Sequence, residues 1–317
     1  IREKQVIELA QSHAKSLDID TNLVVDLMQL LIKSSLRTQE FARVKEEGQG
    51  SGKRALVIGG SGRMGGWFVE FLMLQGFTVD IADPIESESG SRHYSTWEAA
   101  NDDYTITVVA APLRQSIDIL QAMLTAKRRG IIFDIGSIKS PIQSILKNMA
   151  NIGMQVTSIH PMFGPDSDLL TGKQIIFMDI DQQNTHQEVK KLFESTTAQL
   201  IDMSIENHDY AIAYVLGLSH MINIAFAKVL ASTDDNRAVL PNLSSTTFKD
   251  QLNVAKRVTD ENPHLYFEIQ HLNEHSLKTI KELNSAISEI TQAITEGQEE
   301  TFVAMMEEGQ SYFNKNE

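Results

Sequence analysis

A histidine stands directly before a rigid turn in the stretch SIHPMFGPDSD, residues 158–168. The proline after His160 biases the backbone of that histidine towards an extended conformation, which fixes the direction of its ring. An imidazole held in this way is suited to accept the proton of a hydroxyl group whose carbon gives up a hydride. A simpler interpretation is that the turn residues only end a strand, and this segment by itself leaves both interpretations open.

Polar residues also follow the apolar run that comes before the His160 segment in the sequence. In FDIGSIKS, residues 133–140, a predicted strand ends in Asp134, with Ser137 and Lys139 just beyond it. Ligands of doubly wound sheets bind at the carboxyl ends of the strands. Because SIHP ends the next strand along the chain, we expect Ser137 and His160 to lie at the same edge of the sheet.

The stretch ALVIGGSGRMGGWFVEFLMLQGFTVDIADP predicts a dinucleotide site. Its three glycines, Gly60, Gly62 and Gly65, follow a strand-like run and open an amphipathic helix, and a second strand then ends at Asp83. The glycines allow a tight turn and close approach of a pyrophosphate to the N-terminus of the helix. A carboxylate at Asp83 would accept hydrogen bonds from the adenosine ribose and repel a 2′-phosphate, which favours NAD over NADP.

A glycine-rich turn without a ligand and a site for FAD or another nucleotide are the alternatives for this stretch. The residues predicted to bind the cofactor are Gly60, Gly62, Arg63, Met64, Gly65, Asp83 and Pro112.

Four segments are predicted to position these residues. Two amphipathic helices, 3–17 and 22–37, make a leader within residues 1–42, and the polar, glycine-rich residues 43–53 form a linker. Short β-branched runs alternate with helical stretches over 54–205, which predicts a Rossmann-like, doubly wound parallel sheet. From residue 206 to residue 317 only long helical patterns remain. The predicted fold class is therefore α/β, with an all-helical second domain and a short helical leader.

Composition excludes several classes of protein. The 317 residues carry a net charge of −14, which argues against nucleic acid or an anionic membrane as a partner. No apolar run is expected to approach the roughly 20 residues of a membrane span, and no secretory signal is visible, so a cytoplasmic location is expected. The chain has no cysteine, and His271 and His275 lack a third ligand, so no metal site is predicted.

The motifs HPMFGPDS, DIGSIK, VIGGSGRMG and ENHD together resemble those of prephenate dehydrogenases. The likeness is to the type in which a chorismate mutase precedes the dehydrogenase, and it covers essentially the whole chain. It implies NAD-dependent oxidation and decarboxylation of prephenate to 4-hydroxyphenylpyruvate in tyrosine biosynthesis. Apart from the resemblance, the long apolar faces of the predicted helical domain suggest a homodimer interface.

The same resemblance implies roles for individual residues. His160 would be the catalytic histidine that hydrogen-bonds the C4 hydroxyl of prephenate, and Ser137 would orient that hydroxyl. His208 and His220 would bind substrate from the helical domain. Arg257 would grip a substrate carboxylate, with Lys256 as the alternative cation.

The leader resembles the last two helices of an AroQ-type chorismate mutase, with the matching residues Arg2, Glu3, Ser35 and Gln39. The long first helix of that family is missing from this sequence, so we expect no mutase activity from the chain as given. A plain helical hairpin that serves packing or dimerisation is the alternative.

Three other functions remain open at this point. Arogenate is an alternative substrate, because an amine in place of the ketone is not readable from these residues. A β-hydroxyacid dehydrogenase shares the layout, but its catalytic lysine motif is not evident. A non-catalytic NAD-binding module attached to a mutase is the alternative from a different class.

Overall fold

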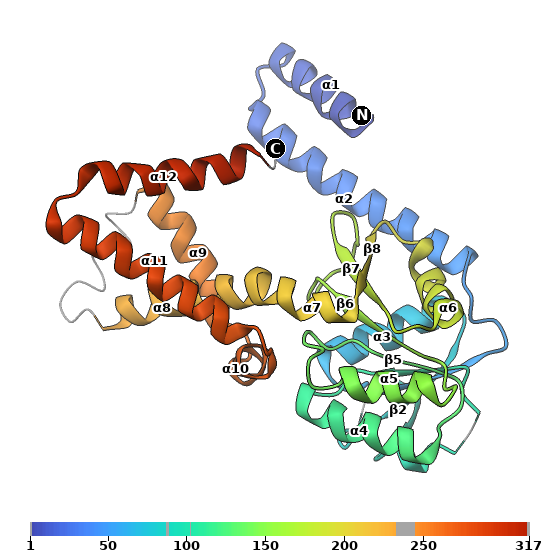
Figure 1. Ribbon diagram of the computed structural model, residues 1–317. Coiled ribbons are helices and arrows are strands. Elements are labelled where there is room, and N and C mark those ends of the chain that lie inside the picture. The colour runs from blue at the N-terminus through green and yellow to red at the C-terminus, as the bar shows by residue number, and fades with distance from the viewer. Residues whose placement is uncertain (1, 87–88, 102, 233–244, 316–317) are drawn as a thin grey trace. The chain divides into compact units, whose positions relative to one another are not determined.

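The computed structural model describes residues 2–86, 89–101, 103–232 and 245–315. The chain divides into two compact units, Ile1–Ile205 and Glu206–Glu317. The first unit contains the sheet and the leader, and the second is helical in its described part (Figure 1).

An eight-stranded sheet with the order β3-β2-β1-β4-β5-β6-β7-β8 forms the first unit. Its strands are β1 (Arg54–Ile58), β2 (Thr78–Ala82), β3 (Arg92–Tyr94), β4 (Ile106–Val109), β5 (Ile131–Asp134), β6 (Val156–Pro161), β7 (Gln174–Asp179) and β8 (Gln199–Ser204). All neighbours from β3 to β6 pair in parallel. The strand order reverses at β1, so its carboxyl end and that of β4 form the crevice where such sheets bind ligands.

Two strands depart from the predicted parallel sheet. β7 runs antiparallel to β6, and β8 is parallel to β7. The connection from β6 to β7, residues 162–173, contains no helix that would carry the chain across a face of the sheet. The chain therefore turns back beside β6 and pairs antiparallel. The helix before β8 restores a parallel crossover for the last strand.

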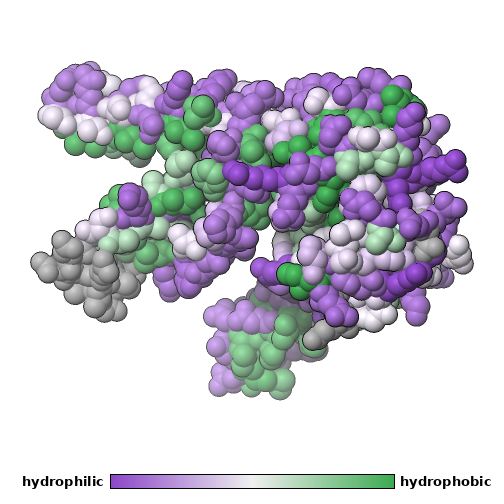
Figure 2. All heavy atoms as spheres, turned by 90° about the horizontal axis from the view of Figure 1, so that it is seen from below, coloured by the Kyte–Doolittle hydropathy of each residue, from purple (hydrophilic) through white to green (hydrophobic). Residues whose placement is uncertain are grey.

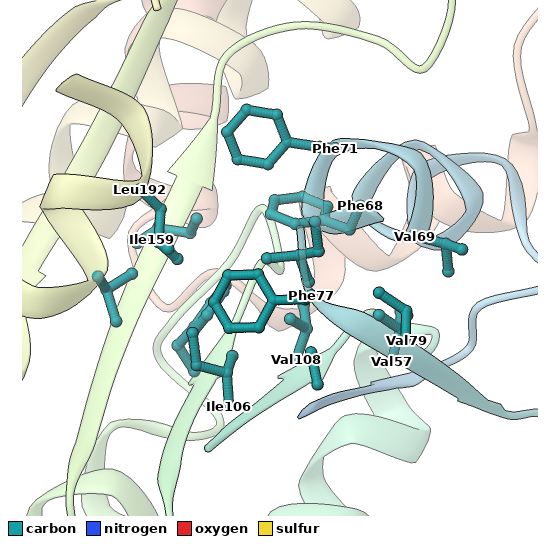
Figure 3. Close-up of a cluster of buried hydrophobic side chains, with 14 of the residues drawn as sticks. Val57, Phe68, Val69, Phe71, Phe77, Val79, Ile106, Val108, Ile159 and Leu192 are labelled. Carbon is teal, nitrogen blue, oxygen red and sulfur yellow. The ribbon is translucent and has the colours of Figure 1, made fainter. Parts of the chain in front are cut away.

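Helices cover both faces of the sheet, as expected for a doubly wound fold (Figure 1). The pair α3 (Arg63–Leu74) and α6 (Gln183–Glu194) packs on one face, and the pair α4 (Leu113–Ala126) and α5 (Gln143–Asn151) packs together on the other; a short 3₁₀ turn, η1 (Trp97–Ala99), precedes β4. Figure 3 shows the core between α3 and the strands, where Phe68 and Phe77 are both buried. Phe68 also meets Phe193 of α6 edge to face, with 6.3 Å between ring centroids. Each fully buried phenylalanine stabilises the fold by roughly 1.5–3 kcal/mol.

The leader consists of α1 (Arg2–Ser16) and α2 (Thr21–Glu46). Asp20 caps α2 by accepting a hydrogen bond from the N–H of Asn22 at 2.8 Å. The predicted linker 43–53 begins too early, because α2 continues through Glu46. The reason is tertiary packing: Val44 is 2% exposed and belongs to the core of the sheet unit.

The second unit is built from one long helical run and four further helices in its described part. The run comprises α7 (Ile205–Ile212), the π-helical segment η2 (Ala213–Leu218) and α8 (Ser219–Ala231); α9 (Thr246–Thr259), α10 (Pro263–Leu272), α11 (Ser276–Glu296) and α12 (Glu299–Asn314) follow. Residues 205–231 are long and apolar enough to cross a membrane by length and composition. The expectation that no apolar run approaches this length was therefore wrong.

Candidate functional site

The loop between β1 and α3 has the close contacts that require glycine. A Cβ atom on Gly65 would lie 2.0 Å from the carbonyl oxygen of Gly59, and one on Gly60 would lie 2.9 Å from the side chain of Ile81. Gly59 itself has φ of +80°, a left-handed conformation that favours glycine. These contacts let α3 begin directly against the end of β1.

The first N–H groups of α3 are available to a ligand. Gly62 occupies the N-cap position and has no side chain to accept from them. Uncapped amides and the positive end of the helix dipole form a ready anion site. The residues present therefore fit the pyrophosphate of a dinucleotide.

Asp83 lies one residue beyond β2, beside this loop. Its carboxylate accepts hydrogen bonds from the N–H of Ser61 at 3.2 Å and from the N–H of Ile85 at 2.9 Å. A carboxylate has about four lone-pair sites, so two ribose hydroxyls can still be bound. The carboxylate thus shapes the loop and also presents negative charge where a 2′-phosphate would lie.

The other predicted cofactor residues surround the same crevice. Arg63 is the first residue of α3, and its guanidinium pairs with the carboxylate of Asp166 at 2.6 Å. Met64 is half-buried against the core, and Pro112 is the exposed N-cap residue of α4. Asp166 belongs to the loop that follows His160, so this loop reaches the N-terminus of α3.

His160 and Ser137 follow neighbouring strands at the carboxyl edge of the parallel sheet. His160 is the fifth residue of β6 and is 4% exposed, and Ser137 lies three residues beyond the end of β5 and is half-buried. From β1 to β6 is three strand spacings, about 14 Å in all. The sheet thus brings the glycine loop, Ser137 and His160 to one edge.

A buried polar network lies behind these residues; the sequence placed Asp134 and Lys139 near this strand end but did not predict that they pair. The ammonium group of Lys139 is fully buried and donates to Asp134 at 2.6 Å. The same carboxylate accepts from the hydroxyl of Ser158 at 2.5 Å and the N–H of Gly136 at 2.9 Å. The signal in the sequence was an aspartate at the strand end with a lysine five residues later.

In the second unit, His220 of α8 has the features of a binding residue. It is 8% exposed, and its ring stacks on that of Tyr266 with 4.1 Å between centroids. Among the described residues, its buried Nδ1 has no hydrogen-bond partner. Burial lowers the pKa of His220, so the ring is held neutral and able to accept or donate one hydrogen bond.

The two candidate cations lie side by side on α9, around a hollow of about 620 Å³. The ammonium group of Lys256 pairs with Asp260 at 2.5 Å. Arg257 is exposed and makes no ion pair within the part of the chain that the structure describes. Of the two, Arg257 is the cation that remains available to an anion.

His208 lies in α7 and is completely buried. Its Nδ1 is 2.7 Å from the carboxylate of Asp209, and the carbonyl of Asp209 accepts from Asn273 at 2.8 Å. These contacts tie α7 to the turn between α10 and α11.

The mutase-like residues lie on the leader. Arg2 and Glu3 are exposed in the first turn of α1. On α2, the side chain of Gln39 donates to the hydroxyl of Ser35 at 3.1 Å, across one turn of the helix. No group of three or more potential metal ligands occurs in the described ranges.

A glycine loop at the switch point of a doubly wound sheet, with a polar carboxyl edge, defines a dinucleotide-binding protein of the Rossmann class. Comparison with known families agrees. Residues 87–202 match "Prephenate dehydrogenase, nucleotide-binding domain", and residues 204–308 match "Prephenate dehydrogenase, dimerization domain". The chain belongs to the prephenate dehydrogenase family and is an NAD-dependent oxidoreductase.

Individual relatives show the same likeness. The T-protein of Enterobacter agglomerans is 24% identical over 98% of this chain and 81% of its own length. A probable arogenate/prephenate dehydrogenase of Methanocaldococcus jannaschii is 24% identical over 81% of this chain and 60% of its own length.

A solved structure, the prephenate dehydrogenase of A. aeolicus with hydroxyphenyl propionate and NAD+, has the same fold. Its TM-score is 0.68 at 21% identity, and the match covers 84% of this chain and 98% of that one. These relatives confirm the resemblance and the fold class predicted from the motifs.

Proposed function

We propose that this chain converts prephenate and NAD to 4-hydroxyphenylpyruvate, CO2 and NADH. Family membership supports the reaction class, and the crevice beside the glycine loop would hold NAD, which would supply the hydride acceptor. The observation that carries the proposal for this chain is the buried His160 at the carboxyl edge of the sheet that also holds the glycine loop.

His160 takes the proton of the C4 hydroxyl group in this proposal, while the hydride leaves the same carbon. Ser137, on the neighbouring strand end, orients the hydroxyl by hydrogen bonding. Loss of the ring carboxylate as CO2 makes the ring aromatic, so the step is effectively irreversible. A general base of this kind contributes about 10²–10⁴-fold to the rate.

The second unit provides substrate-binding residues in this proposal. Within the described ranges the Nδ1 of His220 has no partner, which supports a hydrogen bond to substrate. Arg257 has no ion pair among those same residues and lines the hollow on α9, which supports binding of a carboxylate. For His208, complete burial and its contact with Asp209 favour a supporting role in holding α7.

The preference for prephenate over arogenate is the part of the proposal that most needs a test. The two substrates differ in the side chain attached to the ring, which is a keto acid in prephenate and an amino acid in arogenate. NADH absorbance should be followed with each substrate and with NAD and NADP. We expect the highest kcat/KM with prephenate and NAD, and a folded chain that oxidises neither substrate would overturn the proposal.

We also propose that the second unit forms a homodimer. Many large apolar side chains of this unit are exposed, and Figure 2 shows hydrophobic side chains at the surface among hydrophilic ones. They include Val215, Val229, Phe267, Leu277, Ile287, Ile294, Met306 and Phe313, all more than half exposed. This many exposed large apolar side chains in one helical unit favour association with a second copy. Light scattering of the purified chain should give the mass of two chains.

A cytoplasmic location without membrane or nucleic-acid partners completes the proposal. The apolar run 205–231 contains the buried polar residues His208, Asp209 and His220, which a lipid-facing helix would not tolerate without partners. Cell fractionation of the full chain should recover it without detergent; recovery only in the membrane pellet would contradict the proposal.

A further inference from the structure

Strand β6 extends beyond its parallel neighbour just before it reaches His160. The register between β5 and β6 ends where Asp134 lies beside Ser158. Ile159, His160 and Pro161 continue, and on the other side they pair with β7. On the side of β5, the strand partner is replaced by the loop of residues 135–139.

Lys139 makes the contact that replaces the missing strand. Its ammonium group donates to the carbonyl oxygen of Ile159 at 2.9 Å. If β5 were longer, one of its backbone N–H groups would donate to this carbonyl oxygen in the ladder between the two strands. The side chain of a lysine therefore fixes the peptide that joins Ile159 to His160.

The charge of this lysine is balanced within the same network. Lys139 and Asp134 are 0% and 1% exposed at their side chains and lie 2.6 Å apart. The carboxylate of Asp134 also accepts from Ser158 and from Gly136. A buried ion pair is stable only with such additional hydrogen bonds, and removing one partner leaves an uncompensated charge.

We propose that Lys139 is the positioning residue of His160. The inference rests on the proposed role of His160 as the base. Lys139 holds the extended end of β6, and Asp134 holds Lys139. Ser158 and His160 are two residues apart in one strand, so their side chains point to the same face, at a spacing of about 7 Å. The charge of Asp134, bound to Ser158, therefore lies on the face to which His160 points.

The role predicts a specific kinetic change in Lys139→Met. Without its anchor the imidazole is displaced, and kcat should fall by about 10–100-fold, because misplacement by about 1 Å costs this much. The dissociation constant of NAD should stay within about twofold, since Lys139 follows β5, two strands away from the β1 that precedes the glycine loop. The unpaired carboxylate of Asp134 should raise the pKa of His160, which moves the acid limb of the kcat/KM profile to higher pH.

A double variant separates the effect of the position of His160 from the effect of the charge of Asp134. Lys139→Met with Asp134→Asn removes both charges together, which a buried site tolerates better than the loss of one. Because the bond to Ile159 is still missing, kcat should remain low, while the acid limb should return close to that of the wild type. This variant also decides the question if Lys139→Met alone fails to fold.

Lys190→Met is the matched control. It breaks another lysine–aspartate pair of the same unit, Lys190 with Asp202 at 2.5 Å, at the edge strand β8. It should change thermal stability and leave both kcat and the pH profile unchanged. A folded Lys139→Met or double variant with kcat within about twofold of the wild type would overturn the inference.

A measurement without substrate separates this inference from the proposed reaction. The ring nitrogens of His160, observed by ¹⁵N NMR and assigned with His160→Asn, should shift in Lys139→Met and not in Lys190→Met. Unchanged ring signals would overturn the positioning role even if the chain oxidises prephenate. If the wild-type chain does not turn over, the proposed function fails, and the NMR result still decides whether Lys139 positions His160.

Discussion

The side chain of Glu40, on the leader helix α2, accepts a hydrogen bond at 2.9 Å from the N–H of Leu170, in the loop that follows His160. Its other oxygen accepts from the N–H and the hydroxyl of Thr197, at 2.5 and 2.6 Å. The same loop is held by α3, where Trp67 donates to the carbonyl of Ser167 at 3.1 Å. The leader is therefore part of the structure that fixes the loop after His160.

Replacement of Glu40 by alanine should lower the free energy of unfolding by about 2–4 kcal/mol, because a buried N–H group and a partly buried one lose a charged acceptor. Glu46→Ala, an exposed position on the same helix, is the control and should leave the stability nearly unchanged. Thermal unfolding of the full chain by circular dichroism is the measurement. Equal melting temperatures for the two variants would show that the leader does not stabilise the sheet unit.

Two adjacent glycines give a sharp test of the cofactor loop. A Cβ atom at Gly65 would lie 2.0 Å from the backbone oxygen of Gly59, whereas one at Gly66 would lie 3.7 Å from that of Gly60. Gly65→Ala should thus weaken NAD binding by about tenfold or more, and Gly66→Ala should keep it and gain up to about 1 kcal/mol of helix stability. Titration of NAD with each variant measures both. Equal affinities would show that the approach of α3 to β1 is not needed for binding.

Replacement of the proposed base tests the chemistry directly. His160→Asn keeps a polar side chain but cannot take up a proton, so kcat should fall by about 10²–10⁴-fold while NAD still binds. His13→Asn on the exposed surface of α1 is the matched control and should keep full activity. Initial rates with saturating prephenate and NAD give the comparison. A His160→Asn enzyme with nearly normal kcat would mean that another group accepts the proton.

The two neighbouring cations of α9 are distinguished by their partners. Arg257→Ala should raise KM for prephenate by about 10–100-fold with little change in kcat, because a carboxylate contact is lost in ground and transition states alike. Lys256→Ala removes a cation that is already paired with Asp260, so its KM should change little. If instead Lys256→Ala raises KM and Arg257→Ala does not, Lys256 is the carboxylate-binding residue.

Burial of His220 predicts how stability depends on pH. Its pKa is lowered from the usual value of 6.5, so the unfolded chain binds a proton at a pH where the folded chain does not. The stability that this histidine contributes is present above about pH 6.5 and is lost as the pH falls through the lower folded pKa. His220→Phe retains an aromatic ring against Tyr266 and removes this contribution. The difference in melting temperature between about pH 7.5 and about pH 5.5 should be smaller in the variant than in the wild type.

Much of the fold was predicted because its signals are local. Short β-branched runs, the glycines at 60, 62 and 65, and the helical patterns after residue 206 each depend on neighbouring residues, and the strands, the glycine turn and the helices confirm them. The family motifs likewise identified the prephenate dehydrogenase family, because each motif is a short run of residue types along the chain.

Other features depended on contacts between residues far apart in the sequence. The polar residues 43–46 gave no sign that α2 continues through them, because Val44 is buried against a sheet that forms later in the chain. β7 runs antiparallel because the connection from β6, residues 162–173, contains no helix. The pattern of apolar residues within a strand does not indicate the direction in which that strand runs.

The sequence by itself determined the glycine loop and the family, and it singled out His160 as the proposed base, because these depend on residue type and close spacing. Only the tertiary structure decided which side chain donates to the residue before that histidine. Lys139 is 20 residues before Ile159 and meets it only because β5 ends earlier than β6. Burying a charged group costs free energy unless the group is paired. Which groups pair therefore depends on which groups the folded chain buries together, and a pattern along the sequence does not show this.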